Sequence, residues 1–183
     1  MDHGASSYRR YLDGDESAFD EIVKELFDPL VFFLAQYVRD VHTAEDLAID
    51  VFADLVAHPK RYNFKVTLKT YVFMLGKSRA LNYIKHKTSL RETALEDASH
   101  LSDDGDSVET LFLRDARARA LHKALAELSD DMRLAVHLVF FEELTYEETA
   151  KVMKKNKKQV DNLLYRAKRE LRAILGKDEE FLT

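Results

Sequence analysis

The sequence predicts an all-α protein of two small helical domains joined by a flexible acidic linker, and three observations lead to this prediction. Glycine and proline number only 5 and 2 in 183 residues, whereas strand-rich proteins need turn-forming residues far more often. Leu, Ala, Glu, Lys and Arg, which favour helices, are abundant. Apolar residues recur with helical spacing in most of the chain, and this spacing is weak between residues 88 and 110.

The first domain is expected at residues 8–89. Ser17 can cap a helix that Asp28 and Pro29 interrupt, so a second segment should begin there. Thr43 opens the next helix, which ends before Pro59. The loop at residues 60–66 precedes a long helix, capped by Thr67 and extending to about residue 86.

The linker is expected at residues 90–110 and the second domain at residues 111–176. Apolar spacing returns in a helix that ends near Leu128, and Ser129 can cap the next helix, through residue 141. Thr145 and Glu148 form the capping box T-x-x-E of a short helix. A turn at residues 154–156 leads into a final basic helix over residues 157–175.

Charge is distributed in blocks of one sign. Residues 60–91 carry nine Lys or Arg and no carboxylate, whereas residues 92–113 carry seven carboxylates and no Lys or Arg. Residues 151–175 again hold nine basic side chains against two acidic ones. A generic solvated surface mixes its charges, so two separated basic blocks indicate two contacts with one polyanion, despite a net charge of −5.

Several classes of function are disfavoured by what the sequence does not contain. It has no cysteine, which excludes disulfides, thiolate zinc sites and cysteine nucleophiles. The seven histidines form no H-E-x-x-H pattern, and there is no Gly-rich phosphate loop or G-x-S-x-G elbow. We therefore expect no metal, no cofactor and no enzyme activity. The amino terminus has no apolar signal core and no apolar run is long enough to cross a membrane, which predicts a cytoplasmic protein without direct membrane insertion.

The last two helices have the pattern of a helix-turn-helix, in which the second helix enters the major groove. Its first turns should expose side chains that can bond base edges or phosphates: Lys157, Lys158, Gln159, Asn162 and Arg166. The alternative is a helical hairpin whose charges are merely solvated.

The long helix offers a second candidate nucleic-acid surface. At 100° per residue one stripe holds Tyr71, Met74, Ser78, Asn82 and Lys85. An aromatic ring, two short polar groups and a lysine suit single-stranded DNA, through stacking, hydrogen bonds to base edges and phosphate neutralisation. Alternatively, Tyr71 is an ordinary core aromatic residue.

Three segments of the second domain are similar to region 4 of sigma-70 family RNA polymerase sigma factors, and most of all to the extracytoplasmic-function (ECF) group. They are Leu125-Ala-Glu-Leu-Ser-Asp-Asp-Met-Arg, Phe140-Phe-Glu-Glu-Leu-Thr-Tyr-Glu-Glu-Thr-Ala and Val160-Asp-Asn-Leu-Leu-Tyr-Arg-Ala-Lys-Arg-Glu-Leu. The resemblance implies binding to the −35 promoter element and to the polymerase β flap. The family usually has Gly where Lys154 stands and often at Glu143; a left-handed Lys154 would cost about 1 kcal/mol relative to Gly.

In the first domain, Ala44-Glu-Asp-Leu-Ala-Ile-Asp-Val-Phe resembles sigma region 2.2, A-E-D-L-x-Q-E-x-F, which binds the β′ clamp helices. The resemblance assigns polymerase binding to five residues, Glu45, Asp46, Leu47, Asp50 and Phe52. Ile49 replaces the usual Gln. The alternative for Asp46 is a purely local role as a helix-capping residue.

The stretch Thr70-Tyr-Val-Phe-Met-Leu-Gly-Lys-Ser-Arg-Ala-Leu-Asn-Tyr-Ile-Lys resembles sigma regions 2.3 and 2.4, with Tyr71 for Trp, Ser78 for Asn and Asn82 for Asp. The resemblance implies −10 contacts by Tyr71, Lys77, Ser78, Asn82 and Lys85. It also places the capture of a flipped −10 base in the loop of Tyr62, Asn63, Phe64 and Lys65. The acidic linker would thread through basic channels of the polymerase; a tether with no site is the alternative.

We therefore expect an ECF sigma factor that binds core RNA polymerase and directs it to promoters with −10 and −35 elements. Its partners would be core polymerase, promoter DNA and, as a family expectation, an anti-sigma factor. Two alternatives stay open from the residues alone. One is a stand-alone helix-turn-helix regulator acting without polymerase, and the other is a helical protein that sequesters a partner and does not bind DNA.

Overall fold

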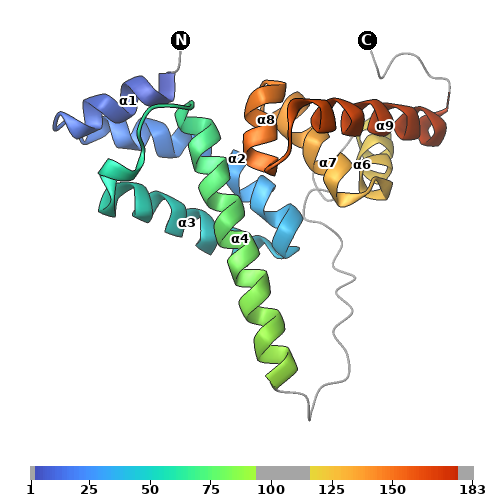
Figure 1. Ribbon diagram of the computed structural model, residues 1–183, viewed down its shortest axis with the longest axis horizontal. Coiled ribbons are helices and arrows are strands. Elements are labelled where there is room, and N and C mark those ends of the chain that lie inside the picture. The colour runs from blue at the N-terminus through green and yellow to red at the C-terminus, as the bar shows by residue number, and fades with distance from the viewer. Residues whose placement is uncertain (1–2, 94–115, 177–183) are drawn as a thin grey trace.

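All regular structure in the described residues, 3–93 and 116–176, is helical (Figure 1), in a computed structural model of the chain. The predicted linker at residues 90–110 lies mostly outside these residues. The amino-terminal module, residues 3–93, contains α1 (His3–Leu12), α2 (Ser17–Val38), α3 (Val41–Ala57), the 3-10 turn η1 (Pro59–Arg61) and α4 (Leu68–Thr93). The carboxy-terminal module, residues 116–176, contains α6 (Ala116–Glu127), α7 (Asp130–Val136), the π-helical η2 (His137–Phe141), α8 (Tyr146–Met153) and α9 (Lys157–Leu175).

Helix α2 forms the centre of the amino-terminal module, where α1, α3 and α4 all pack against it. Its buried stripe includes Ile22, Leu26, Leu30 and Phe33. Gly76 allows α4 to approach closely, because a Cβ atom there would lie 2.8 Å from the Cδ1 atom of Leu30. The glycine therefore sets the distance between α2 and the helix that carries the predicted −10 stripe.

The predicted interruption at Pro29 is wrong, because α2 continues through the proline. A proline inside a helix removes one backbone hydrogen bond, here the one that would reach the carbonyl of Glu25. Glu25 is exposed, so water can hydrate that carbonyl. The apolar stripe continues on both sides of the proline, at Leu26 and Leu30, and its burial outweighs the local cost.

Two other predicted helix ends also move. Helix α3 begins before Thr43, because the carboxylate of Asp40 caps it and accepts a hydrogen bond from the Thr43 amide at 2.6 Å. Helix α4 extends to Thr93, beyond the predicted end near residue 86. In Figure 1 its carboxy-terminal turns project past the other helices, so these turns are held by the local helix preference of their residues.

The carboxy-terminal module has the predicted helix-turn-helix. Thr145 and Glu148 form the capping box of α8, and Ala150, Val152, Val160 and Leu164 are buried between the two helices. Lys154 ends α8 in the left-handed conformation, with φ of 56°. The position at which the sigma family usually has Gly therefore has the backbone that favours Gly.

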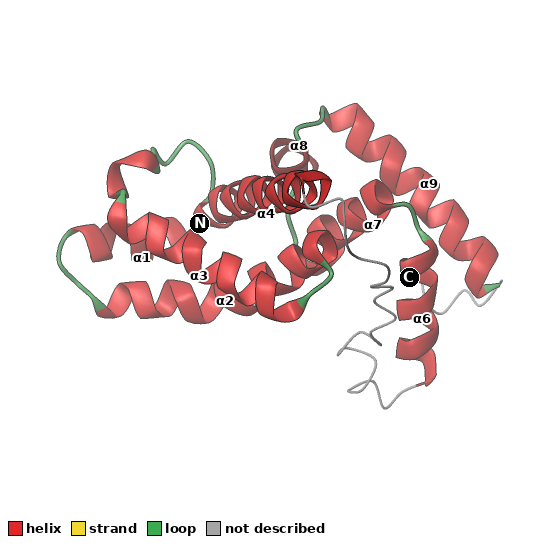
Figure 2. Cartoon of the chain, turned by 90° about the horizontal axis from the view of Figure 1, so that it is seen from below, coloured by secondary structure: helices red, strands yellow, loops and turns green. Residues whose placement is uncertain are grey.

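The two modules pack against each other through α4 and α8. Viewed nearly along its axis in Figure 2, α4 lies between the helices of the amino-terminal module on one side and α6–α9 on the other. Buried apolar residues of both modules form one continuous cluster, from Tyr8 to Leu171. The two modules are therefore docked on each other in this structure.

Candidate nucleic-acid interfaces

The predicted stripe on α4 is a surface of the amino-terminal module. Met74, Ser78, Asn82 and Lys85 are exposed, and Tyr71 is half-buried at the amino-terminal end of the stripe. The Tyr71 ring lies 5.1 Å, centroid to centroid, from the ring of Tyr62. Through this contact the stripe continues into the loop of residues 62–65.

That loop presents some of its predicted residues and buries another. Tyr62 is only 3% exposed and its hydroxyl donates to the carbonyl of Val66 at 2.8 Å, so it supports the loop from inside. Asn63 and Lys65 are exposed, and the Asn63 side-chain oxygen accepts a hydrogen bond from the Lys65 amide at 3.1 Å. Phe64 is half-buried, with a left-handed backbone at φ of 59°.

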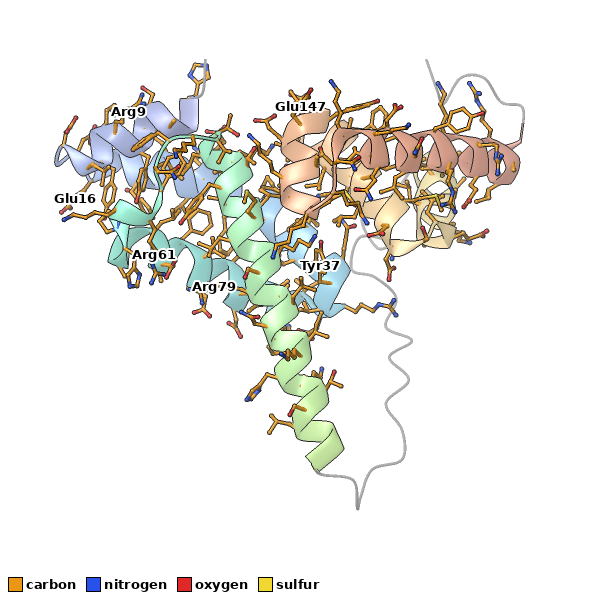
Figure 3. The ribbon with its side chains drawn as sticks, viewed as in Figure 1. Arg9, Glu16, Tyr37, Arg61, Arg79 and Glu147 are labelled. Atoms are coloured by element: carbon orange, nitrogen blue, oxygen red, sulfur yellow. The ribbon has the colours of Figure 1, made fainter. Side chains whose placement is uncertain are left out.

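Asp54 anchors the start of this loop to two helices. Its carboxylate, 9% exposed, accepts a hydrogen bond from Arg61 Nη1 at 3.0 Å and lies 3.3 Å from Arg79 Nη2. His58 Nδ1 is 3.1 Å from the same carboxylate. Figure 3 shows Arg61 and Arg79 on neighbouring segments around α3. The pattern of the sequence gave no indication of this role of Asp54, because its partners come from α3, η1 and α4.

The predicted polymerase-binding residues of α3 fall into an exposed group and a buried group. Asp46 and Asp50 are exposed and Glu45 is half-buried, whereas Leu47 and Phe52 are 9% and 6% exposed and belong to the core. Leu47 and Phe52 therefore hold the helix in place and are not available at the surface.

Sequence reasoning missed two exposed apolar residues on α3, Ile49 and Val56, with 56% and 46% of their surface accessible. They lie seven residues apart, hence on one side of the helix, beside Asp46 and Asp50. This α3 face, comprising Glu45, Asp46, Ile49, Asp50 and Val56, combines acidic and apolar groups. The sequence signal that could have indicated this face is Ile49 itself, an apolar residue where the resembled motif usually has Gln.

Helix α9 exposes its amino-terminal turns as predicted. A shallow open groove there is lined by Lys155, Gln159, Asn162, Leu163 and Arg166. The side-chain oxygen of Gln159 accepts from the Asn156 amide in a second capping box, so its amide NH₂ group faces outward for other partners. Lys157 Nζ is bonded to Glu147 at 2.5 Å, whereas Lys158 is exposed.

Tyr165 and Arg169 extend the same face of α9. They are exposed and fall within about 20° of Lys158 when each residue advances by about 100°. Tyr165 has 70% of its surface accessible, a large fraction for an aromatic side chain. The prediction from the sequence was confined to charged and amide side chains in the first turns of this helix, up to Arg166, and therefore did not include Tyr165 and Arg169.

A buried carboxylate lies where the modules meet. Glu142 Oε2 is 2.9 Å from Lys69 Nζ of α4, and Glu142 Oε1 is 3.2 Å from His137 Nε2. Burial by itself would raise the pKa of Glu142, but the neighbouring His137 and Lys69 outweigh burial and hold it below its usual value. The His137 ring stacks between Phe33 of α2 and Phe141.

A second polar contact joins α4 to α8. Glu148 Oε1 accepts hydrogen bonds from the hydroxyls of Thr67 at 2.9 Å and Thr70 at 3.2 Å. Lys77, a predicted −10 residue, donates from Nζ to the carbonyl of Met153 at 2.8 Å. Burial and the nearby Lys154 lower the pKa of Lys77. The docked carboxy-terminal module therefore covers Lys77 and leaves Ser78, Asn82 and Lys85 exposed.

The described part of the chain holds neither a metal-binding cluster nor a membrane-spanning helix. No cluster of three or more His, Cys, Asp or Glu side chains there is placed to hold a metal ion. None of the helices described is both long enough and apolar enough to span a bilayer.

Both modules match family models of known proteins. The model described as "Sigma-70 region 2" matches residues 22–89, and "Sigma-70, region 4" matches residues 118–171. The two matches fall one in each module and together span two thirds of the chain.

Curated proteins match over most of the chain. The RNA polymerase sigma-H factor of Pseudomonas aeruginosa is 26% identical over 85% of this chain and 84% of its own length. The ECF RNA polymerase sigma factor SigM of Bacillus subtilis is 26% identical over 86% of this chain and 95% of its own. The sigma factor CarQ of Myxococcus xanthus is 26% identical over 93% and 96%.

Solved structures share the fold. The sigma factor RpoE of Bartonella quintana, in a co-crystal with the anti-sigma factor NepR, superposes with a TM-score of 0.63 at 23% identity, over 88% of this chain and 98% of the other. CnrH, in complex with the cytosolic domain of CnrY, gives a TM-score of 0.61 at 17% identity, over 97% of each chain.

Proposed function

This chain belongs to the sigma-70 family of RNA polymerase sigma factors, in its ECF group, and we propose that it holds promoter DNA through one surface on each module. It is a transcription initiation factor that binds core RNA polymerase and directs it to promoters by recognising −10 and −35 elements. This proposal rests on one observation: the exposed polar stripe of α4 and the exposed face of α9 lie on separate modules.

The −10 surface is the loop together with the α4 stripe. Asn63, Phe64 and Lys65 receive an unstacked base, supported from below by the buried Tyr62. Ser78, Asn82 and Lys85 follow the strand along α4, because they are exposed on one side of the helix beyond Tyr71. Lys77 joins them only after the carbonyl of Met153 has moved away.

The −35 surface is the first half of α9. Gln159 and Asn162 present amide groups to base edges, and Lys157, Lys158 and Arg166 neutralise phosphates. Lys157 must exchange its bond to Glu147 for a phosphate, so we expect it to contribute less than Lys158, which has no carboxylate partner among the described residues.

The polymerase-binding surface is the α3 face. Glu45, Asp46 and Asp50 attract basic residues of the β′ clamp helices, and Ile49 and Val56 add apolar area that docking removes from water. Leu47 and Phe52 contribute indirectly, as the core residues that fix the helix. The carboxy-terminal module binds the β flap.

In this proposal, the two modules are docked on each other when the factor is free of polymerase. The half-buried Lys77 supports this state, because its ammonium group donates to the carbonyl of Met153 in the docked carboxy-terminal module. Binding to core polymerase separates the modules and sets the spacing between the two DNA surfaces, so that two weak contacts act together.

Run-off transcription tests this function. Purified chain and core polymerase are incubated with a library of promoter templates, and the transcribed templates are sequenced. We expect one class of template with fixed spacing between two conserved elements. Asn82→Ala and Lys158→Ala should lower transcription at least about tenfold, whereas Lys24→Ala and Lys123→Ala, which remove exposed cations elsewhere, should not.

Selective binding of a palindromic operator by the free chain, with no association with core polymerase, would favour the stand-alone regulator. The factor itself carries no enzyme activity in this proposal and works in the cytoplasm, where the polymerase is. The solved structures of RpoE and CnrH are complexes with NepR and with the cytosolic domain of CnrY, so we also propose an anti-sigma partner for this chain.

A further inference from the structure

Helix α1 lies before the residues that match sigma region 2, yet it contacts the −10 loop. Tyr8 anchors it: the side chain is fully buried, and its hydroxyl donates to the carbonyl of Leu55 at 2.8 Å. The following residue, Arg9, is exposed and places its guanidinium carbon 4.6 Å from the centre of the Phe64 ring. This distance is well inside the range of a cation–π contact. Figure 3 shows Arg9 on α1.

Arg9 differs from its neighbour in its electrostatic partners. Arg10 donates hydrogen bonds to Asp15 and Glu21, at distances between 2.6 and 3.2 Å, and its charge is compensated there. No carboxylate among residues 3–93 and 116–176 lies within ion-pair distance of Arg9. Its charge is therefore held in place by an aromatic ring and stays available to an anion.

Phe64 is itself held in a strained backbone conformation. Its φ of 59° lies in the left-handed region, which is unfavourable for a residue other than glycine. Contacts with the rings of Tyr62, at 4.5 Å, and Tyr8, at 6.3 Å, keep the ring in place. Because packing maintains this strained backbone, the Phe64 ring has one defined position, and so does the Arg9 guanidinium that rests on it.

We propose that Arg9 is a further −10 DNA-binding residue: while resting on Phe64, it donates hydrogen bonds to a phosphate of the strand whose base enters the loop. The planar fork of a guanidinium matches phosphate oxygens, and stacking leaves its N–H edge free. Exposed Lys65, on the loop itself, adds a second cation in addition to Arg9 of α1. This inference rests on the proposed function, since it assumes that the loop receives the −10 strand.

The salt dependence of binding tests this contact. Holoenzyme is titrated with the single-stranded −10 region of the promoter selected by transcription, across a range of salt concentrations. Each phosphate contact to single-stranded DNA contributes about 0.7 to the slope of log K against log salt. Arg9→Gln should lower affinity roughly fivefold to tenfold and make the slope shallower by about 0.7. Arg9→Lys should keep the slope.

Arg10→Ala is the matched control, because it removes a neighbouring arginine whose charge is already compensated, and it should leave the slope unchanged. Thermal unfolding and core-polymerase affinity establish that each variant folds; Arg9→Gln retains a planar group over Phe64 for that purpose. A wild-type slope and affinity for Arg9→Gln would overturn the inference. Failure of the wild-type holoenzyme to bind the −10 strand would instead overturn the proposed function.

Discussion

Glu148 accepts a hydrogen bond from the hydroxyl of Thr67, 81 residues away, at 2.9 Å. One oxygen of this carboxylate caps α8 by accepting from the amide of Thr145, and the other accepts from Thr67 and from Thr70 of α4. A residue that sequence pattern assigns to local capping therefore also joins the two modules.

Removing one donor of this bridge should loosen the docked arrangement. In Thr70→Val the fully buried hydroxyl that donates to Glu148 is replaced by a methyl group of similar size. A hydrogen bond to a charged group contributes about 1.5–3 kcal/mol, so the separated form should become more populated. Small-angle scattering should report a larger radius of gyration. Thr88→Val, which removes an exposed hydroxyl bonded only within α4, is the control. Equal radii for the two variants would contradict the prediction.

Acid should weaken the contact at Glu142. Because its pKa is lower in the folded chain than in the unfolded chain, the ionised carboxylate stabilises the folded form at neutral pH. That stabilisation is fully present above the unfolded pKa of about 4.3, and is lost as pH falls through the depressed value. Glu142→Gln should therefore lower the free energy of unfolding at pH 7 and have a smaller effect near pH 3, as measured by urea denaturation. Exposed Glu143→Gln should have little effect at either pH.

Two residues of α9 should affect promoter binding differently. Asn162 presents an amide to base edges, so Asn162→Ala should reduce discrimination between −35 sequences by about 1–3 kcal/mol. Arg169 lies two turns further along α9 and should contact phosphate. Arg169→Ala should therefore weaken binding to all sequences alike and reduce the salt slope by about 0.9. Holoenzyme affinities for a panel of −35 variants separate the two effects. A sequence-selective loss in Arg169→Ala would show that the arginine contacts a base.

A charge on the α3 face should impair polymerase binding. Ile49→Asp places a carboxylate where docking would remove it from water, and should lower affinity for core polymerase by about tenfold or more. Leu12→Asp, which alters an apolar side chain of comparable exposure on α1, is the control. Affinity is measured by competition with a labelled sigma factor. Unchanged binding of Ile49→Asp would place the polymerase contact elsewhere.

Local sequence determined how well the fold could be predicted. The limits of α9 match the prediction, residues 157–175, because the capping side chains Asn156 and Gln159 lie within one turn of each other. The helix-turn-helix and its buried residues follow from spacing alone. The prediction of a break at Pro29 was wrong because the effect of the proline on α2 depends on packing against other helices, which a local pattern does not contain.

The candidate surfaces were predictable to a lesser degree. Periodicity placed Ser78, Asn82 and Lys85 on one exposed stripe, and the structure has them there. The resemblance to a family motif grouped the exposed Asp50 with the buried Leu47 and Phe52, because a motif does not distinguish a residue that contacts a partner from one that supports the helix. The covering of Lys77 depends on a carbonyl 76 residues away and has no signature in the sequence.

Asp54 holds the start of the proposed base-binding loop against α3 and α4. Arg61, which precedes the loop, bonds to the Asp54 carboxylate on α3, the helix proposed to face the polymerase. Arg79 of α4 contacts the same carboxylate. The Nη1 atom of Arg79 also lies 3.7 Å from the exposed carboxylate of Asp50. If α3 docks on the clamp as proposed, a small displacement of α3 moves the loop with it through the contact of Asp54 with Arg61. In the proposed function, capture of the −10 strand is therefore coupled mechanically to polymerase binding through Asp54.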